Sequence, residues 1–291
     1  MVAILFRDVI ERAIQVLSEE GIGDAVTDAW LLSEYCLGIN KQKYYMDMNI
    51  QIEDADCEKY MKYVEKRKSH IPLQHITGEQ EFMGLTFHVN EHVLIPRQDT
   101  ELLVEKAIKA VEKVKRARGI NDEIKVLDMC TGSGCIAISV AKLCENTKVT
   151  AVDISEEALE VAKKNACNNS VEIEFIQSDL FENVGGKYDV ILSNPPYIPT
   201  KIIDTLEEEV KSHEPLRALD GDEDGLSFYR KISEEAFRYL KEDGYLIYEV
   251  GHDQGDMVSL LLRKKASYVR VYKDLAENDR VVIAGKEEEN V

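Results

Sequence analysis

The tetrapeptide Asn-Pro-Pro-Tyr at Asn194–Tyr197 contains the residue types of this chain that are best suited to chemistry. It follows the apolar segment 188–193, which is typical of a buried strand, so Asn194 is expected where a strand ends and a loop begins. Pro195 and Pro196 fix φ and lack N–H groups, which leaves carbonyl oxygens beside the Asn194 amide. Such acceptors can bind both hydrogens of a planar NH2 group, and Tyr197 offers a ring to stack on it. This arrangement favours methyl transfer to an amide or exocyclic amino nitrogen, and a proline-rich turn is the structural alternative.

A glycine-containing turn follows another apolar segment, 124–129, which is also expected to be a strand. The turn consists of Cys130, Thr131, Gly132, Ser133 and Gly134, and an apolar helix is expected directly after it. Glycines between a strand and a helix let a ligand approach the backbone closely. Because Gly-x-Gly alone matches many unrelated loops, the prediction of a cofactor site rests on the order of strand, turn and helix.

Aspartates lie beyond the next two expected strands. Asp153 ends segment 148–152, where a carboxylate can accept hydrogen bonds from both ribose hydroxyls of a nucleoside. Asp179, followed by Leu180, lies beyond segment 171–176 and can accept from an adenine amino group. Taken singly, each aspartate can also cap a helix or lie in a solvated loop. NAD and S-adenosylmethionine both satisfy these requirements, and the Asn-Pro-Pro-Tyr segment on the fourth strand favours S-adenosylmethionine.

Alternating strands and helices predict an α/β fold from residue 96 onward. The expected strands are 124–129, 148–152, 171–176, 188–193, 244–250, 268–273 and 280–285, and the expected helices are 100–115, 135–145, 156–168 and 225–240. Short apolar strands separated by helices favour a doubly wound, mostly parallel sheet of seven strands, in which the last two form an antiparallel pair.

Residues 1–75 show helical spacing of apolar residues and predict a small N-terminal helical domain. Thr27 or Asp28 is placed to cap its second helix. No reactive cluster is visible there, so we expect this domain to dock a partner. The remaining expected parts are a β-hairpin connector at 76–95, the α/β domain at 96–286 and a tail at 287–291.

The composition limits the classes of partner and cofactor. The net charge of −19 disfavours nonspecific contact with phosphate backbones, although a local basic patch can overrule it. The six cysteines form no Cys-x-x-Cys pair, and no histidine cluster completes a zinc site, so no metal is predicted. No apolar run reaches the ~18 residues that a membrane span needs, and no secretory signal is recognised. The sequence therefore predicts a cytoplasmic protein without a membrane partner.

Over nearly its whole length, the sequence resembles the release-factor glutamine N5-methyltransferases. The segments that carry the resemblance are Gly78 to Phe82, Pro96 to Glu101, Asp128 to Gly134, Asp153, Asp179, Asn194 to Tyr197, Glu214 to Leu216 and Glu277 to Arg280. Cys130 departs from the family pattern, in which the loop usually begins with glycine.

The resemblance implies a Rossmann-like methyltransferase sheet, S-adenosylmethionine as the cofactor, and class I peptide chain release factors as partners. The implied methyl acceptor is the glutamine of their Gly-Gly-Gln tripeptide, whose amide Asn194 and the Pro195 carbonyl would hold. The implied catalytic and substrate-binding residues are Asn194, Pro195, Pro196 and Tyr197. The implied cofactor-binding residues are Cys130, Thr131, Gly132, Ser133, Gly134, Asp153, Asp179, Leu180 and Asn194.

Two alternatives remain. DNA or RNA adenine N6-methyltransferases use the same amino-recognition segment, but the negative charge and the lack of a basic target-reading domain disfavour them, so no direct nucleic-acid substrate is expected. A noncatalytic binding protein on the same scaffold is disfavoured by the complete glycine turn, aspartates and tetrapeptide. Labelled S-adenosylmethionine offered with either a release factor or DNA discriminates between these hypotheses.

Overall fold

A computed structural model describes residues 4–119 and 122–285, which form two compact units. The helical unit comprises the chain through Glu79 together with residues 207–213. The larger unit comprises residues 80–206 and the chain from Glu214 onward. The predicted tail at 287–291 lies outside the described residues.

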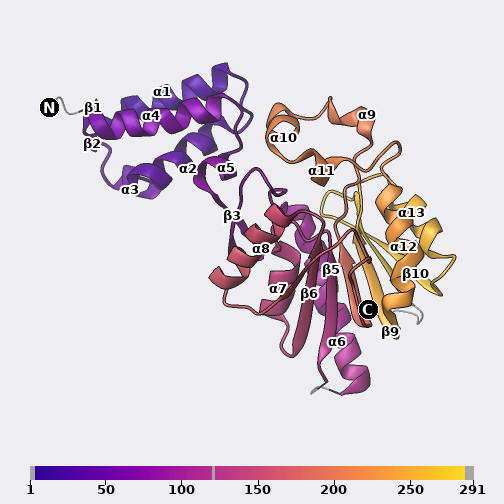
Figure 1. Cartoon of the computed structure of the whole chain (residues 1–291). Helices are drawn as coiled ribbons and strands as arrows, with labels where there is room; N and C mark the ends of the chain where they lie inside the picture. Colours follow the sequence, from indigo (N-terminus) through magenta and orange to yellow (C-terminus); the bar gives the residue numbers. More distant parts are fainter. Residues whose placement is uncertain (1–3, 120–121, 286–291) are drawn as a thin grey trace. The chain divides into compact units, whose positions relative to one another are not determined.

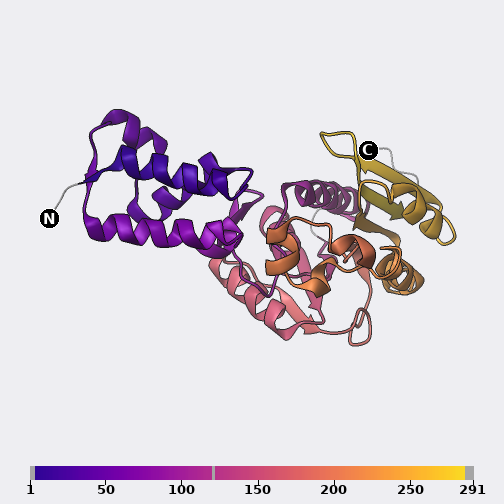
Figure 2. The ribbon, with the colours of Figure 1, turned by 90° about the horizontal axis from the view of Figure 1, so that it is seen from above.

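The helical unit is built mainly from α1, α2 and α4, which pack against one another (Figure 1 and Figure 2). Its elements are β1 (Ile4–Leu5), α1 (Phe6–Glu19), α2 (Ala25–Leu37), α3 (Lys41–Met46), β2 (Gln51–Ile52), α4 (Asp54–Lys68), α5 (Leu73–Thr77) and α10 (Glu208–His213). Fully buried side chains such as Phe6, Leu32 and Tyr60 form its core, and the Tyr60 hydroxyl donates to the Ala29 carbonyl at 2.9 Å. This unit therefore has an apolar core of its own.

A buried ion-pair cluster includes α10 in the helical unit. Arg67 Nε lies 2.7 Å from Asp28 Oδ2, and another guanidinium nitrogen of Arg67 lies 2.6 Å from Glu209 Oε2. The prediction of Thr27 or Asp28 as a cap is wrong, because α2 begins at Ala25 and the buried Asp28 pairs with Arg67. Burial raises the pKa of Asp28, and the hydrogen bond from Arg67 lowers it. The helical unit thus includes residues 207–213, which lie outside the range 1–75 given for it in the sequence analysis and which contain the glutamate of this cluster.

The larger unit contains a strand–helix alternation preceded by a short two-stranded sheet, where a hairpin was predicted. Its elements are β3 (Glu79–Phe82), β4 (Leu85–His88), a 3-10 helix (Gln98–Thr100), α6 (Glu101–Arg118), β5 (Ile124–Met129), α7 (Cys135–Leu143), β6 (Thr147–Asp153), α8 (Glu156–Asn168), β7 (Glu174–Gln177), β8 (Tyr188–Ser193), α9 (Thr200–Ile203), α11 (Leu216–Leu219), α12 (Ser227–Tyr239), β9 (Leu240–Glu249), α13 (Gly255–Leu262), β10 (Tyr268–Lys273) and β11 (Asp279–Gly285).

The central sheet has the strand order β10-β11-β9-β8-β5-β6-β7, which confirms the predicted seven-stranded, doubly wound fold. The strands β9, β8, β5, β6 and β7 are parallel to one another, whereas β11 is antiparallel to both β9 and β10. Because β6 lies on one side of β5 and β8 on the other, the chain direction around the sheet reverses at β5. Ligands of open α/β sheets bind beyond the strand carboxyl ends at such a reversal.

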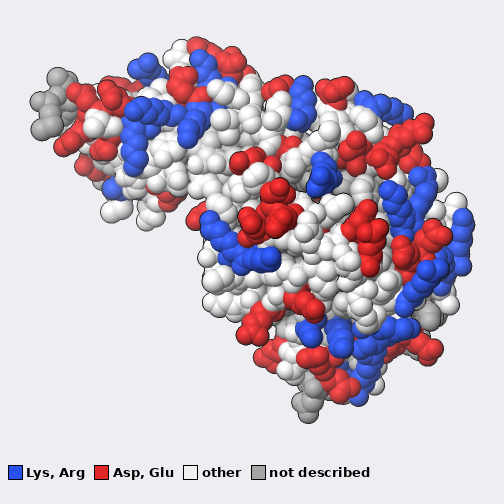
Figure 3. All heavy atoms as spheres, in the orientation of Figure 1, with Lys and Arg blue, Asp and Glu red and all other residues white. Residues whose placement is uncertain are grey.

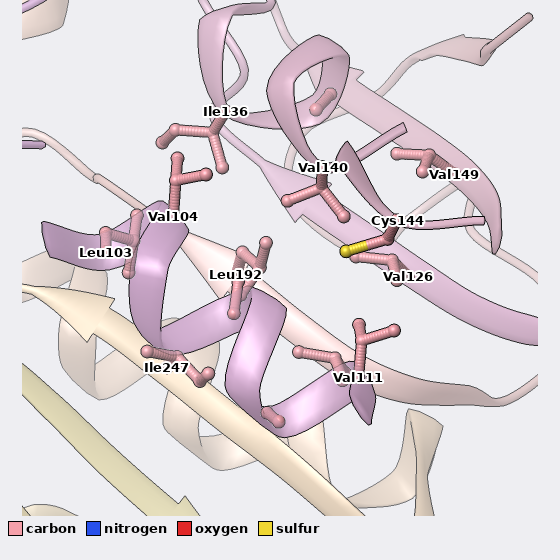
Figure 4. Packing of buried hydrophobic residues seen from close by; sticks show 14 of the residues in the cluster. Leu103, Val104, Val111, Val126, Ile136, Val140, Cys144, Val149, Leu192 and Ile247 are labelled. Carbon is pink, nitrogen blue, oxygen red and sulfur yellow. The ribbon is translucent and has the colours of Figure 1, made fainter. Parts of the chain in front are cut away.

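Alternating side chains along the strands supply both apolar layers. Val126 of β5 points into a cluster with α6 and α7, which Figure 4 shows from close by. The next residue, Leu127, belongs to the cluster with α12 and α13 on the opposite face. Burying a side chain of this size stabilises the folded chain by about 1.5–3 kcal/mol. These two layers fix β5 and β8, whose carboxyl ends carry the glycine turn and the Asn-Pro-Pro-Tyr segment.

Two predicted strands differ from the structure by more than one residue at an end. The third strand was expected at 171–176, but β7 starts at Glu174, because its ladder with β6 begins there. The fifth was expected from residue 244, but β9 starts at Leu240, which pairs with Tyr188 before a register shift. The polar residues after Leu240 concealed this extension in the sequence.

Three further observations concern the surface charges, the helices and the metal-ligating side chains. On the face shown in Figure 3, acidic and basic side chains are both present among uncharged atoms. Within the described residues, none of the helices combines the length and apolar character that a membrane span requires. Across 4–119 and 122–285, no three His, Cys, Asp or Glu side chains are grouped so that they hold a metal ion.

Candidate functional site

The turn between β5 and α7 uses backbone conformations that favour glycine. Cys130, Gly132 and Gly134 have φ values of +63°, +54° and +80°. A Cβ at Gly134 would lie 3.0 Å from Ala162 Cβ of α8, so close helix packing adds to the conformational requirement there. At Gly132 nothing lies within 4 Å of such a Cβ, so the backbone faces open space. Cys130 adopts the left-handed region despite its Cβ, which costs about 1–2 kcal/mol.

Hydrogen bonds to buried groups hold the remaining turn residues. Thr131 Oγ1 donates to Asp128 Oδ2 at 2.6 Å, and both residues are buried. Burial raises the pKa of Asp128 to about 7. The Ser133 carbonyl accepts from Asn165 Nδ2 at 2.9 Å, so α8 also fixes the turn. Burial raises the pKa of the Cys130 thiol, which is therefore neutral and a weak nucleophile.

Asp153 connects the ends of β5 and β6. Its Oδ2 accepts from the Gly132 amide at 2.8 Å, and its Oδ1 accepts from the Ser155 amide at 3.0 Å. Burial raises the pKa of Asp153, and the backbone hydrogen bonds from Ser155 and Gly132 lower it. Since each carboxylate oxygen has two lone pairs, Asp153 can still accept from hydroxyl groups of a ligand.

Asp179 and Leu180 follow β7. Asp179 is exposed, and Leu180 is partly buried with a φ of +47°. The neighbouring Ser178 amide donates to the Asp153 carbonyl at 3.0 Å, which ties this loop to the end of β6. The two predicted acidic positions therefore lie on loops that are hydrogen-bonded to each other.

Asn194 lies directly after β8 and is partly buried. Its Nδ2 points to Thr100 Oγ1 at 3.4 Å, which places the carboxamide oxygen on the other side of the group. Pro195 and Pro196 are buried. The Tyr197 hydroxyl donates to Glu249 Oε1 at 3.4 Å, and its ring packs against the apolar cluster that includes α12.

Most of the predicted site residues line one cavity of about 570 Å³ in the larger unit. The predicted residues on its wall are Cys130, Thr131, Gly132, Ser133, Asp153, Asp179, Leu180, Asn194 and Pro196. Gly134, Pro195 and Tyr197 are not among the lining residues. Gly134 is the N-cap residue before α7, and the Tyr197 hydroxyl is directed toward Glu249.

The cavity rim contains residues that sequence reasoning did not single out. Phe228 and Lys231 of α12 line it, but in the sequence they look like ordinary residues of an amphipathic helix. Arg217 also lines it, next to the segment Glu214–Leu216 that the family resemblance had marked. The buried Glu214 carboxylate accepts from the Ile95 amide at 3.3 Å and pairs with Arg97, which joins two parts of the rim.

Comparisons with known proteins agree with this architecture. The domain family described as PrmC N-terminal domain matches residues 8–78, and the family described as Methyltransferase small domain matches residues 100–210. A release factor glutamine methyltransferase of Fusobacterium nucleatum is 40% identical over 285 residues, which cover 96% of this chain and 78% of the relative. The chain belongs to the release factor glutamine methyltransferase family.

A second release factor glutamine methyltransferase, from Clostridium acetobutylicum, is 38% identical over 96% of this chain and 97% of its own length. As a member of this family, the chain is a protein-(glutamine-N5) methyltransferase. A crystal structure of a methyltransferase from Pyrococcus furiosus superposes with a TM-score of 0.50 and 18% identity, covering 79% of this chain and 98% of that one. That last similarity concerns the fold alone.

Proposed function

We propose that this methyltransferase uses S-adenosylmethionine to methylate N5 of the glutamine in the Gly-Gly-Gln tripeptide of class I peptide chain release factors. We place this reaction in the cytoplasm, where it would modulate translation termination. The observation that carries the proposal is that Asn194 shares one cavity with the glycine turn and Asp153. In this proposal, the acceptor for the NH2 group and the site for the nucleoside would face the same space.

The residues around the cavity fit S-adenosylmethionine. Its volume of about 570 Å³ is typical of cofactor sites. The open space beside Gly132 lets a ligand approach the turn backbone, and Asp153 can accept from ribose hydroxyls. Asp179 and Leu180 would hold the adenine end, and the glycine turn would hold the remainder of the cofactor. When bound, the cofactor supplies an electrophilic methyl group on a sulfonium sulfur.

The Asn-Pro-Pro-Tyr segment would hold the methyl acceptor. Asn194 Oδ1 and the Pro195 carbonyl would accept the two N–H hydrogens of the glutamine amide, while Pro196 and Tyr197 keep the loop rigid. An amide nitrogen is a poor nucleophile because its lone pair is delocalised. Two fixed acceptors orient this nitrogen and stabilise the positive charge that develops on it. A strong general base is not required, because the amide proton can leave to water after the N–C bond forms.

The deciding experiment gives the full-length chain radiolabelled S-adenosylmethionine together with an intact class I release factor. We expect one methyl group on the Gly-Gly-Gln glutamine, located by mass spectrometry of the factor's peptides. A factor whose tripeptide glutamine is replaced by glutamate lacks the amide nitrogen and should stay unlabelled. Duplex DNA and RNA are included as alternative acceptors. Label on an adenine, or none on the factor, would contradict the proposal.

A further inference from the structure

A buried carboxamide outside the cavity holds the backbone of the Asn-Pro-Pro-Tyr segment. Gln254, the residue before α13, is 9% exposed and donates from Nε2 to the Tyr197 carbonyl at 2.9 Å. The same nitrogen lies 3.3 Å from the Gly225 carbonyl, and Oε1 accepts from the Gly251 amide at 3.0 Å. Both ends of the carboxamide are therefore bonded, and its orientation is fixed.

Two glycines allow the chain to close around Tyr197. A Cβ at Gly225 would collide with the Tyr197 carbonyl oxygen, and a Cβ at Gly221 would lie 2.8 Å from Tyr197 Cα and 2.9 Å from the Pro196 carbonyl oxygen. The Ile198 carbonyl accepts from the Gly221 amide at 2.8 Å. The Tyr197 backbone is thus packed closely against Gly221 and Gly225 and is hydrogen-bonded to Gln254.

The side chain of Tyr197 contacts the β9–α13 turn, in which Gln254 also lies. Its hydroxyl donates to Oε1 of Glu249, the last residue of β9, at 3.4 Å. The Tyr229 hydroxyl donates to the Glu249 carbonyl at 2.8 Å and so helps to fix the end of β9. The β9–α13 turn therefore contacts both the hydroxyl and the carbonyl of Tyr197.

A hydrogen bond from outside the Asn-Pro-Pro-Tyr segment is needed because the segment itself has few backbone donors. Pro195 and Pro196 have no N–H groups, so two consecutive backbone positions cannot donate to a neighbouring strand or turn. A loop that presents acceptors to a substrate amide aids methyl transfer only while those acceptors stay aligned, and a displacement of about 1 Å can cost on the order of 100-fold in rate. The Tyr197 carbonyl is the first carbonyl after the prolines, and it accepts from Gln254, a donor outside the loop.

We propose that Gln254 is a positioning residue for methyl transfer. By holding the Tyr197 carbonyl, it keeps the Asn194 carboxamide and the Pro195 carbonyl in one geometry. Gln254 does not itself line the cavity, so it acts through the loop. This inference rests on the function proposed above and adds to it a residue from a different part of the chain.

The test compares the full-length wild type with Gln254→Glu, which keeps the side-chain shape but replaces the donor by an oxygen facing two carbonyls. For intact release factor, we expect kcat to fall on the order of 10- to 100-fold while KM stays within about threefold. The dissociation constant for S-adenosylmethionine, measured by calorimetry, should also stay within about threefold. Hydrogen exchange of the Gly221 amide, which bonds to Ile198, should accelerate, and this readout does not depend on activity.

A second variant and a matched control complete the design. Gly225→Ala leaves the Gln254 residue in place but puts a Cβ against the same carbonyl and 2.7 Å from Gln254 Nε2, so it should disrupt the same hydrogen bond and lower kcat in the same way. Gln80→Glu is the control, because Gln80 Nε2 also donates to a backbone carbonyl, that of Glu81 at 2.8 Å, but outside this loop. Gln80→Glu should keep wild-type kcat.

The outcomes separate the two proposals. A wild type that labels no release factor overturns the proposed function. An active wild type with unchanged kcat in Gln254→Glu overturns the role of Gln254. Loss of cofactor affinity together with kcat, or failure of both loop variants to fold, would mean that Gln254 supports the whole unit and does not specifically position the loop, which also overturns the inference.

Discussion

The carboxylate of Asp153 accepts a hydrogen bond from the Gly132 amide at 2.8 Å, across 21 residues of sequence. This bond joins the carboxyl ends of two adjacent parallel strands, β5 and β6. Asp153 therefore shapes the glycine turn in addition to facing the cavity. A substitution there should affect a bound nucleoside directly and also through the turn.

Asp153→Ala should weaken S-adenosylmethionine binding by roughly 1.5–3 kcal/mol, because a charged hydrogen-bond acceptor is lost. Calorimetric titration of the full-length variant measures this change, and circular dichroism checks that the fold persists. Asp47→Ala is a suitable control, because Asp47 also accepts from a backbone amide, that of Asn49 at 3.0 Å, but in the helical unit. Unchanged cofactor affinity in Asp153→Ala would reject the assignment.

Asn194→Ala should reduce the single-turnover rate of methyl transfer on the order of 10²–10³-fold, because one of two preorganised acceptors is removed. Cofactor affinity should change little. If Asn194 only stabilised a turn, the variant would lose thermal stability and keep its specific activity. Asn40→Ala represents that alternative, since Asn40 Oδ1 caps α3 by accepting from the Lys43 amide at 3.0 Å. A folded Asn194→Ala chain with near-normal turnover would refute the amide clamp.

Cys130→Gly should stabilise the chain by about 0.5–1 kcal/mol. Glycine removes the cost of about 1–2 kcal/mol for a side chain at positive φ, and the greater freedom of the unfolded chain offsets part of this gain. Urea unfolding measures the difference. The same substitution at Cys57, which lies inside α4, should instead destabilise by about 1 kcal/mol. If both substitutions changed the free energy of unfolding in the same direction, backbone strain at Cys130 would not be the cause of the effect of Cys130→Gly.

Glu249 should make stability depend on pH. Burial raises its pKa from an ordinary 4.5 to about 7, so the native chain retains a proton that the unfolded chain releases between these values. Stability from the neutral carboxyl is therefore present below pH 4.5 and is lost as pH rises through about 7. Glu249→Gln keeps a neutral group at every pH, and its oxygen can still accept from Tyr197.

Urea unfolding at two pH values tests this linkage. At pH 8 the free energy of unfolding of Glu249→Gln should exceed that of the wild type by up to about 3 kcal/mol, and the difference should shrink near pH 5. Glu145→Gln makes the same substitution at an exposed position and serves as the matched control. A constant difference between wild type and Glu249→Gln at both pH values would exclude Glu249 as the titrating group.

Sequence reasoning located the parts of the site that obey local rules. Gly132 and Asp153 were predictable because a strand, a turn and a helix appear in order, and because parallel strands bring their carboxyl ends to one edge of the sheet. Asn194 was predictable because two prolines directly follow an apolar strand. The structure brings all three to one cavity, and their proposed roles remain predictions.

The parts that were missed depend on contacts between distant segments. Gln254 reaches the Tyr197 carbonyl across 57 positions, and nothing in its local sequence indicates that contact. Glu209 meets Arg67 across an even longer separation, in a segment that reads as an ordinary charged helix. The helical or strand periodicity around Gln254 and Glu209 does not indicate which residue each one contacts. Only the folded structure identifies these contacts.

The membership of residues 207–213 in the helical unit limits how far the two units can be exchanged between relatives. A chimera joined near residue 79 would combine one protein's Arg67 and Asp28 with another protein's counterpart of Glu209. Likewise, a fragment that starts at residue 80 keeps Glu209 but loses the guanidinium that it contacts. Evolutionary or engineered exchange of the helical unit therefore has to transfer two separate stretches of the gene together.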